Sequence, residues 1–488
     1  MSLSEKVQPI FRVLPEIPKP GKRLSLGERL FWTGLVLVVY LVMSQIPLFG
    51  IPYLPRSAGS YLTVLRLITA SRRGTLMELG IGPLVTSGLI WQLLVGSRIV
   101  KLDTSTPEGR ATFTGLEKLF TIIFTIVEAS AYILGGAYGH LSTNAALIVF
   151  AQLFLATALV MLMDEMLQKG WGVGSGVSLF IAAGVAQRIF WQLFSPITLR
   201  QTGNLPLGVL SALFVAIGNG ISSGDWSALS TVAFRSFYPN LVGLATTVAL
   251  FLLLLYLENV QVEIPVSMTK YGGIRSKIPL KFLYVSVIPV IIIGALYSNI
   301  FIFSQLIWAR LHTQPNNWFY NNIFKYIANY NVTAYNEGRG FIPLPGTLVY
   351  YLTSPRGIRS IVQDPLRVVI YSVVFLVLSV LFSIAWVEAA GMDPWSQARQ
   401  ISKAGLQIPG FRGSPRAMAI VLERYIPALT ILSGLVVGLI AVVGNLLNVL
   451  SSGMGLLLLV EILIQYHTII AQERALEAYP LLRKLVKP

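Results

Sequence analysis

The sequence predicts an all-α, polytopic membrane protein with ten transmembrane helices in two pseudo-symmetric halves of five. Of its 488 residues, 54% are hydrophobic and 12% are charged, whereas about a quarter of an average soluble protein is charged. The apolar residues form long runs, and most basic residues lie between those runs. So few charges cannot cover so much apolar side chain in water, and we therefore expect the bilayer to be the solvent.

Each of ten apolar runs has close to the roughly 20 residues that a helix needs to cross a bilayer. They are Leu30–Phe49, Leu76–Val95, Leu116–Tyr138, Ala145–Leu167, Val177–Leu199, Leu241–Leu257, Phe282–Phe303, Val368–Trp386, Ile426–Leu447 and Gly453–Ile470. A further run, Leu205–Ile221, is weaker and contains glycines, and we interpret it as a loop or surface element. The polar first 29 residues lack an apolar core with a cleavage site, so no removable signal peptide is predicted.

Ten spans divide into five and five, and an odd number of spans inverts the second half. This predicts a cytoplasmic N-terminal segment (1–29), a first half (30–200), an outer connection (201–240), a second half (241–470) and a cytoplasmic tail (471–488). The second half would contain two cytoplasmic loops, 258–281 and 389–424. The symmetry is inferred from the count alone, because we find no repeat at the level of residues.

The distribution of charge predicts that both termini are cytoplasmic. The net charge is +16, and Lys and Arg are concentrated in the even-numbered connections and the C-terminal tail, as in cytoplasmic loops. The exceptions are Arg66, Arg72 and Arg73, and the long connection from residue 305 to 364. Long loops escape the rule, so the three arginines need a separate explanation.

The stretch Ser60–Val95 begins with a short apolar helical pattern that is interrupted by arginines and ends at Gly74. This first piece is too short and too charged to cross the bilayer. It is either a half-helix that folds back into the outer side and blocks a pathway, or an amphipathic helix on the outer surface. The pattern alone favours the surface helix.

Two further features lie within or beside spans. The glycine-rich stretch Lys169–Gly176 has no preceding strand, so it predicts a tight turn with close helix packing rather than a nucleotide loop. Glu128 lies inside the third span, where a carboxyl group usually faces a cavity or a partner. It fits either proton-coupled transport or hydrogen-bonded packing. Glu461 lies nearer a span end and needs less explanation.

The connections 268–277 and 409–416 are basic and longer than turns require. They fit docking on a phosphate-rich surface and attraction to anionic lipid equally well. The chain has no cysteine, and its three histidines are far apart. We find no catalytic set, nucleotide loop or metal motif, so we expect no enzymatic activity, no cofactor and no metal.

Several long ordered matches then indicate a family. The runs Ile68–Pro83 and Val85–Gly88 closely resemble the plug and second span of the SecY family, the large subunit of the protein-conducting channel. The resemblance continues at Gly170–Ile181, Val262–Pro265 and, with shorter motifs, to Arg424–Pro427. It covers nearly the whole chain, is nearest to the archaeal and eukaryotic branch, and is weakest near residues 200–235 and 310–345.

The resemblance implies an hourglass pore that an aliphatic ring closes at its waist. The matching ring positions are Ile81, Val85, Val177, Ile181, Ile291 and Leu458. Apolar side chains make no fixed hydrogen bonds to a passing chain, and a narrow apolar constriction hinders ions. The resemblance also identifies the half-helix as a plug, with Tyr61, Leu62, Leu65, Arg66 and Ile68.

The family's lateral gate opens between the second and third spans and the seventh and eighth, and it lets apolar helices partition into lipid. Thr86 and Glu128 match two positions of the polar cluster that crosses it. Val287, beside Ser286, stands where the family commonly has asparagine, which puts the hydrogen bonding of this cluster in doubt. The ribosome-contacting positions of the family match Lys270, Arg275, Lys277, Arg412 and, in the same loop, Arg416.

The resemblance thus implies the central subunit of a protein translocation channel, which passes secretory polypeptides and releases membrane helices sideways. Its expected partners are small single-span subunits (SecE/gamma-type and beta/SecG-type), the ribosome, signal peptides, nascent chains and membrane lipid. The expected membrane is the cell membrane of an archaeon or the endoplasmic reticulum of a eukaryote. A secondary transporter with a broken second helix, and a scaffold without a pore, remain as alternatives.

Overall fold

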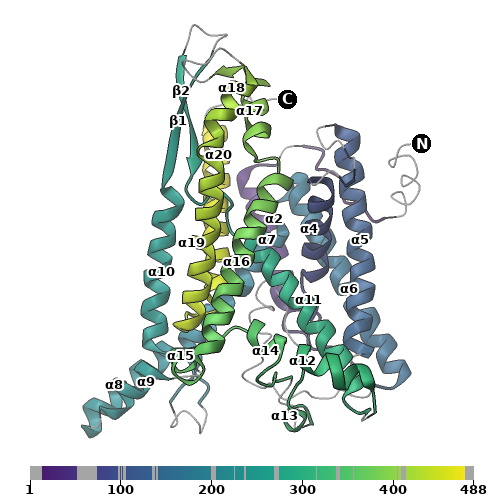
Figure 1. The fold of residues 1–488 in the computed structure, drawn as a ribbon, viewed down its shortest axis with the longest axis vertical. Coiled ribbons are helices and arrows are strands. Elements are labelled where there is room, and N and C mark those ends of the chain that lie inside the picture. The colour runs from purple at the N-terminus through teal and green to yellow at the C-terminus, as the bar shows by residue number, and fades with distance from the viewer. Residues whose placement is uncertain are drawn as a thin grey trace.

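The structure is a computed structural model that describes residues 14–22, 24–51, 74–96, 99–100, 102, 106–134, 138, 141–198, 205–224, 226–235, 238–268, 274–314, 316–336, 341–355, 357–403, 405–407 and 414–478. Within these residues a helix lies at each predicted span (Figure 1). The helices are α2 (Leu26–Met43), α4 (Gly82–Gly96), α5 (Pro107–Leu134), α6 (Thr143–Met166), α7 (Gly176–Phe194), α10 (Leu241–Asn259), α11 (Ile288–Leu311), α16 (Pro365–Ala389), α19 (Ile426–Leu446) and α20 (Gly453–Ala478).

Eight helices of the described part are long and apolar enough to cross a membrane. They correspond to all the predicted spans except those at α4, which has 15 residues, and α5, whose 28 residues include a polar first half. The predicted helical membrane class is therefore confirmed, while the count of ten remains a prediction.

The first and last of these helices meet at one end of the molecule. The backbone N–H of Leu26, which begins α2, donates to Glu477 in the last turn of α20 at 2.7 Å. Arg29 of α2 also pairs with Glu473 of α20 at 2.7 Å. Because α2 begins where α20 ends, the chain crosses the molecule an even number of times, as ten spans require.

Polar side chains at the helix starts satisfy backbone N–H groups that have no partner within the helix. Ser25 and Glu28 form a capping box at the start of α2. Asn240 accepts the N–H of Gly243 at 2.7 Å in α10, and Asp364 accepts that of Arg367 at 3.1 Å in α16. In each of the three helices, the polar capping residue therefore lies shortly before the apolar run.

The two long loops of the second half join in one small sheet at the end where α20 finishes (Figure 1). β1 (Gln261–Met268) pairs antiparallel with β2 (Ile274–Lys281), and β3 (Leu406–Gln407) pairs with the other edge of β1. Helices α17 (Pro394–Lys403) and α18 (Pro415–Glu423) complete the second loop. We call this group the sheet module, and its end of the molecule the sheet end.

The sheet module has its own apolar core. Ile264 and Val266 of β1 are buried together with Met418 and Leu422 of α18. The Tyr284 hydroxyl, in the segment that leads into α11, donates to the carbonyl of Met392 at 2.7 Å. This hydrogen bond ties the segment before α11 to the second loop of the module. The sheet was not predicted, because its strands lie in polar connections.

The opposite end carries the shorter elements. The region predicted as a loop or surface element forms α8 (Val209–Ser223), followed by α9 (Ser227–Phe234). The long connection before α16 contains η4 (Tyr320–Phe324), α12 (Lys325–Ile327), α13 (Val332–Asn336), α14 (Leu348–Leu352) and α15 (Ile358–Gln363). None of these elements is long enough to span a bilayer.

Glycines allow the central helices to pack closely. A Cβ on Gly453 of α20 would lie 2.4 Å from the carbonyl oxygen of Ala441 in α19. A Cβ on Gly176, which begins α7, would lie 2.7 Å from the Cα of Asp164. The π-turn η1 (Leu167–Trp171) follows the end of α6 and leads toward α7. Its Gly170 has a φ of 101°. The predicted tight turn with close packing is therefore confirmed.

Candidate functional site

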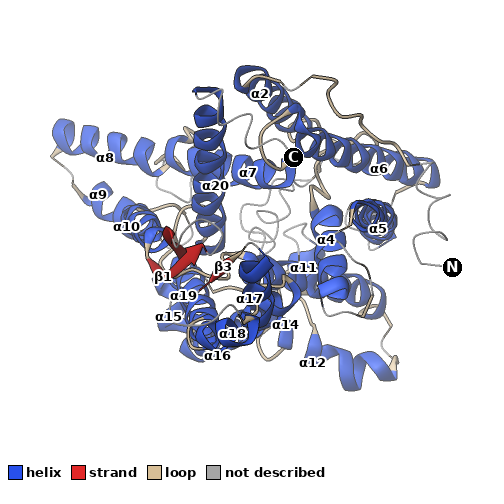
Figure 2. Cartoon of the chain, turned by 90° about the horizontal axis from the view of Figure 1, so that it is seen from above, coloured by secondary structure: helices blue, strands red, loops and turns tan. Residues whose placement is uncertain are grey.

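A cavity of about 420 Å³ lies among the helices of both halves. Its lining comes from α4, α5, α6 and α7 of the first half and from α11, α16 and α20 of the second. Seen from above, α4, α7, α11 and α20 are arranged around this central region (Figure 2). The site thus depends on both halves and cannot be built from either one alone.

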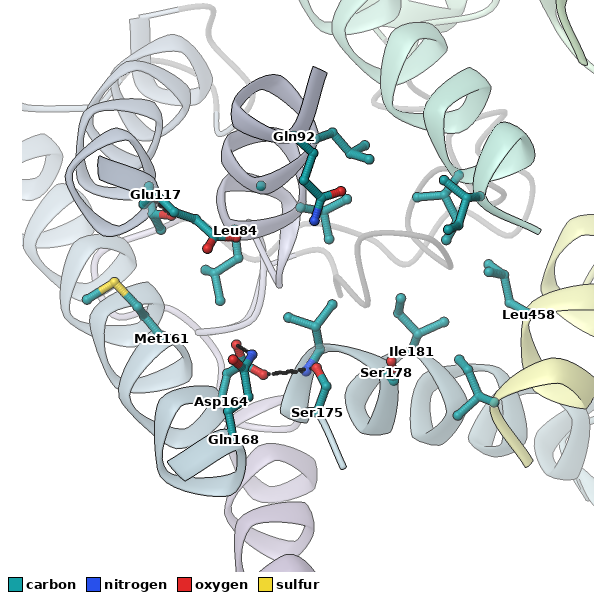
Figure 3. A pocket seen from close by; sticks show the side chains of 18 of the residues that line it. Leu84, Gln92, Glu117, Met161, Asp164, Gln168, Ser175, Ser178, Ile181 and Leu458 are labelled. Carbon is teal, nitrogen blue, oxygen red and sulfur yellow. Dashed lines mark hydrogen bonds between the residues drawn. The ribbon is translucent and has the colours of Figure 1, made fainter. Parts of the chain in front are cut away.

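The predicted ring positions come together at this cavity. Val85, Val177, Ile181, Ile291 and Leu458 all contribute to its lining. Ile81, one turn before Val85, is fully buried and belongs to the same apolar cluster. Figure 3 shows Ile181 and Leu458 close to each other on neighbouring walls. Four helices therefore bring aliphatic side chains to one place, although these residues are as much as 377 positions apart (458 − 81 = 377).

Part of the remaining cavity wall is polar, and this part was not predicted. Asp164 of α6 accepts hydrogen bonds from the N–H of Val177 at 3.0 Å and from the hydroxyl of Ser175 at 3.2 Å (Figure 3). Its other carboxyl oxygen accepts from the Gln168 amide at 2.8 Å. Asp164 thus caps the start of α7 and fixes the helix turn that carries Val177. The sequence signal was an acidic residue in an apolar run, shortly before a helix that begins with Ser–Gly.

An ion-pair network lies beside this cap. Glu165 pairs with Lys118 of α5 at 2.6 Å and with Lys169 at 2.9 Å. Lys169 also pairs with Glu16 of the N-terminal segment. The hydrogen bond and positive charge of Lys169 lower the pKa of the Glu16 carboxyl. This network ties the N-terminal segment to α5 and α6 next to the cavity.

The predicted gate positions lie on helices that meet. Thr86 is on α4 and Glu128 on α5, while Ser286 and Val287 precede α11. α4 packs against α11 and α16, and α5 packs against α11, so the two halves touch along these helices. Val287 lines the cavity, whereas Thr86 and Glu128 are not part of its lining.

Val287 takes part in a hydrogen bond through its backbone. Its N–H donates to the Glu461 carboxyl of α20 at 3.0 Å. The preceding Ser286 has a φ of 64°, a left-handed conformation that is uncommon for serine. We call the Val287–Glu461 hydrogen bond the α11 latch. Glu461 also lines the cavity, which its predicted place near a span end did not indicate.

The predicted ribosome-contacting residues belong to the sheet module. Lys277 on β2 is exposed and pairs with Glu263 of β1, and Arg416 is exposed at the start of α18. Arg275 lies on β2 opposite Ser267. Lys270 and Arg412 lie outside the described residues, as do all the predicted plug residues: Tyr61, Leu62, Leu65, Arg66 and Ile68.

The described residues contain no group of three or more His, Cys, Asp and Glu side chains placed to hold a metal ion. The cavity brings together aliphatic side chains at the predicted ring positions and, elsewhere, amide, carboxyl and hydroxyl groups beside further apolar side chains.

Comparison with known proteins identifies the family. A family model described as SecY matches residues 75–467, and another described as the plug domain of Sec61p matches residues 38–74. The protein translocase subunit SecY of Saccharolobus solfataricus is 42% identical over 495 aligned residues, which cover 100% of both chains.

Solved structures agree with this result. One described as "The structure of a protein conducting channel" has a TM-score of 0.75 and 35% identity, and covers 97% of this chain and 99% of its own. Sec61 in the canine ribosome–channel complex from the endoplasmic reticulum has a TM-score of 0.73 and 35% identity, with the same coverage. The family model over residues 75–467 and the relatives that match over the whole chain lead to one conclusion: this chain belongs to the SecY family.

Proposed function

We propose that this chain is the central subunit of a protein translocation channel, and that unfolded polypeptides pass through its cavity. The observation that carries the proposal is the meeting of six aliphatic side chains in one apolar cluster at a cavity whose wall also carries polar groups: Ile81, Val85, Val177, Ile181, Ile291 and Leu458. Relatives named as protein translocase subunits and protein-conducting channels support it.

The ring suits this task because it lacks specific bonding groups. Aliphatic side chains close against one another when the channel is idle, and they fit around any side chain that passes. A constriction of this kind also resists wetting, which hinders ions. The polar groups on the remaining wall, such as Gln92 and Gln168, offer hydrogen bonds to an extended backbone before it reaches the ring.

The interface of α4 and α5 with α11 and α16 is the proposed lateral gate. Apolar segments of a translocating chain would leave there, because they partition into lipid. Thr86, Glu128, Ser286 and Val287 are the proposed gate residues, and the α11 latch holds the start of one gate helix. Residues 60–73, with the arginines that break the loop rule, are the proposed plug.

The sheet module is the proposed docking surface for the ribosome. Lys277 and Arg416 on this module are exposed, and its two loops contain further basic residues, among them Lys270, Arg275 and Arg412. A structural neighbour of this family is Sec61 in a ribosome–channel complex. The sheet end would then face the cytoplasm with both termini, in a cell membrane. Small single-span subunits are further proposed partners.

The secondary-transporter alternative finds no support in these relatives, which are named as translocase subunits and protein-conducting channels. We propose that the chain performs no catalysis and takes its driving energy from a partner such as the ribosome.

Cross-linking to a stalled nascent chain tests the proposal. A photoreactive residue at Ile81 should react with a ribosome-bound, signal-bearing chain in vesicles that contain the protein and its partner subunits. The control is the same residue at Leu147, which is 71% exposed on the outside of α6. Equal reaction at both positions, or reaction at Leu147 alone, would contradict passage through the cavity.

A further inference from the structure

The hairpin of α8 and α9 extends away from the helix bundle at the end opposite the sheet module. α8 begins beside the end of α7, and α9 leads back to α10. Figure 1 shows α8 reaching outward beyond α10 at the end opposite the sheet module, and Figure 2 shows it pointing away from the centre. With 15 residues, α8 is about 22 Å long. We call α8 and α9 together the arm.

α8 has three distinct faces. Val209, Ala212, Ala216 and Gly220 form the buried face against α9 and its neighbours. A second face carries Leu210, Phe214, Ile217 and Ile221, which recur at helical spacing. We call these four residues the apolar stripe; Phe214 is 71% exposed and Ile221 is 76% exposed. The third face carries the half-buried Ser211 and the exposed Asn219 and Ser222, together with the exposed Val215 and Gly218.

The hairpin is held in shape, so the apolar stripe is a stable surface. Trp226 packs on Gly220, where a Cβ would lie 2.7 Å from its ring. Gly224 ends α8 in the left-handed conformation with a φ of 69°. At its base, the buried Arg235 donates to the carbonyl of Pro206 at 2.8 Å. The exposed apolar side chains of α8 therefore belong to a well-packed hairpin.

The apolar stripe continues the apolar outer surface of the membrane helices. At the end of α7, where the arm begins, Phe190, Trp191, Phe194 and Ile197 are all exposed. Trp226 at the tip is also exposed, and Trp is enriched at the boundary between lipid and water. Neither α8 nor α9 contains a charged side chain; the sequence has Asp225 between the two helices and Arg235 directly after α9.

We propose that the arm lies in the surface of the lipid bilayer at the end opposite the sheet module, with the apolar stripe inserted among the acyl chains and the exposed Asn219 and Ser222 toward water. Interfacial helices usually present basic residues to anionic lipid. This arm has a neutral polar face, so apolar burial alone must hold it. Insertion should therefore occur in zwitterionic lipid and be insensitive to salt.

The proposal stands apart from protein conduction, because it concerns the outer surface and not the cavity. The arm connects α7 to α10, so its insertion in lipid would hold this connection at the membrane surface.

The native chain lacks cysteine, so single cysteines can be introduced without removing any. We would place them at Phe214 and Ile221 on the apolar stripe and, as matched controls on the same helix, at Asn219 and Ser222. Each is labelled with an environment-sensitive fluorophore, and the full chain with its partner subunits is reconstituted in phosphatidylcholine vesicles. Nitroxide-labelled lipids at two known depths then quench the fluorophores.

We expect blue-shifted emission and at least a twofold stronger lipid quenching at Phe214 and Ile221 than at Asn219 and Ser222, unchanged between low and high salt. Equal quenching at all four positions, or quenching only by an aqueous agent, would overturn the proposal. Blue-shifted emission without lipid quenching would also overturn it, because a second copy or a partner subunit would then cover the apolar stripe.

Discussion

Removal of the Glu461 carboxyl should release the start of α11. The N–H of Val287 is buried and has Glu461 as its acceptor at 3.0 Å. Glu461→Ala would leave this N–H without a partner at a cost of about 1–3 kcal/mol. The cost disappears when α11 moves and water reaches the N–H. The equilibrium between closed and open gate should therefore shift about five- to 150-fold toward the open form, since about 1.4 kcal/mol corresponds to a factor of ten.

Glu461→Gln keeps an acceptor oxygen in the same place, so it should restore most of the closed population. Glu473→Ala is the matched control on the same helix, because it removes a carboxyl that pairs with Arg29 of α2 instead of α11.

The assay is a distance measurement across the proposed gate. Spin labels on introduced cysteines at Ile123 of α5 and Leu296 of α11, both exposed, report the separation of the two helices by pulsed electron resonance in lipid nanodiscs. Glu461→Ala should add or enlarge a long-distance population that Glu461→Gln and Glu473→Ala lack. A folded Glu461→Ala variant with the distance distribution of the wild type would refute the latch.

Three further outcomes can be measured directly. Replacing Arg275 and Arg412 with Glu should weaken ribosome binding by more than about 1 kcal/mol at moderate salt, because attraction to phosphate becomes repulsion; unchanged affinity in a co-sedimentation titration would reject the docking surface. Gly453→Ala would place a Cβ 2.4 Å from a backbone oxygen of α19 and should lower stability in a detergent thermal-denaturation assay by about 1–3 kcal/mol, whereas Gly34→Ala, with open space around it, should not. Glu165→Gln leaves two lysine ammonium groups without their shared carboxylate and should cost up to about 3–5 kcal/mol in the same assay; a wild-type melting temperature would show that the network contributes nothing.

The membrane helices could be predicted because their signal is local. A helix in lipid must be apolar over its whole length and must end near polar or charged residues. Pro365 after Asp364, and Leu241 after Asn240, mark such ends directly in the sequence. α8 was harder to predict, because a 15-residue segment that mixes apolar residues with serine, asparagine and glycine fits a loop, a surface helix or a core element equally well.

The site was predictable only in part. The ring was found through resemblance, because nothing in the local pattern distinguishes Val177 from the other apolar residues of α7. Asp164 and Glu461 were not recognised as cavity residues, because each bonds a backbone N–H from another helix. Pairing between helices depends on tertiary packing, which hydrophobic periodicity does not describe.

The pairing of β3 with β1 mechanically couples two loops that are more than a hundred residues apart in the chain. The first loop leads into α11, and the second loop runs from α16 to α19. A force applied to either loop would therefore reach the other loop, and α11 and α16 on one side of the proposed gate would move together. A ribosome bound to either loop alone would then act on both gate helices of the second half. Disruption of the β1–β3 pairing would uncouple the two helices.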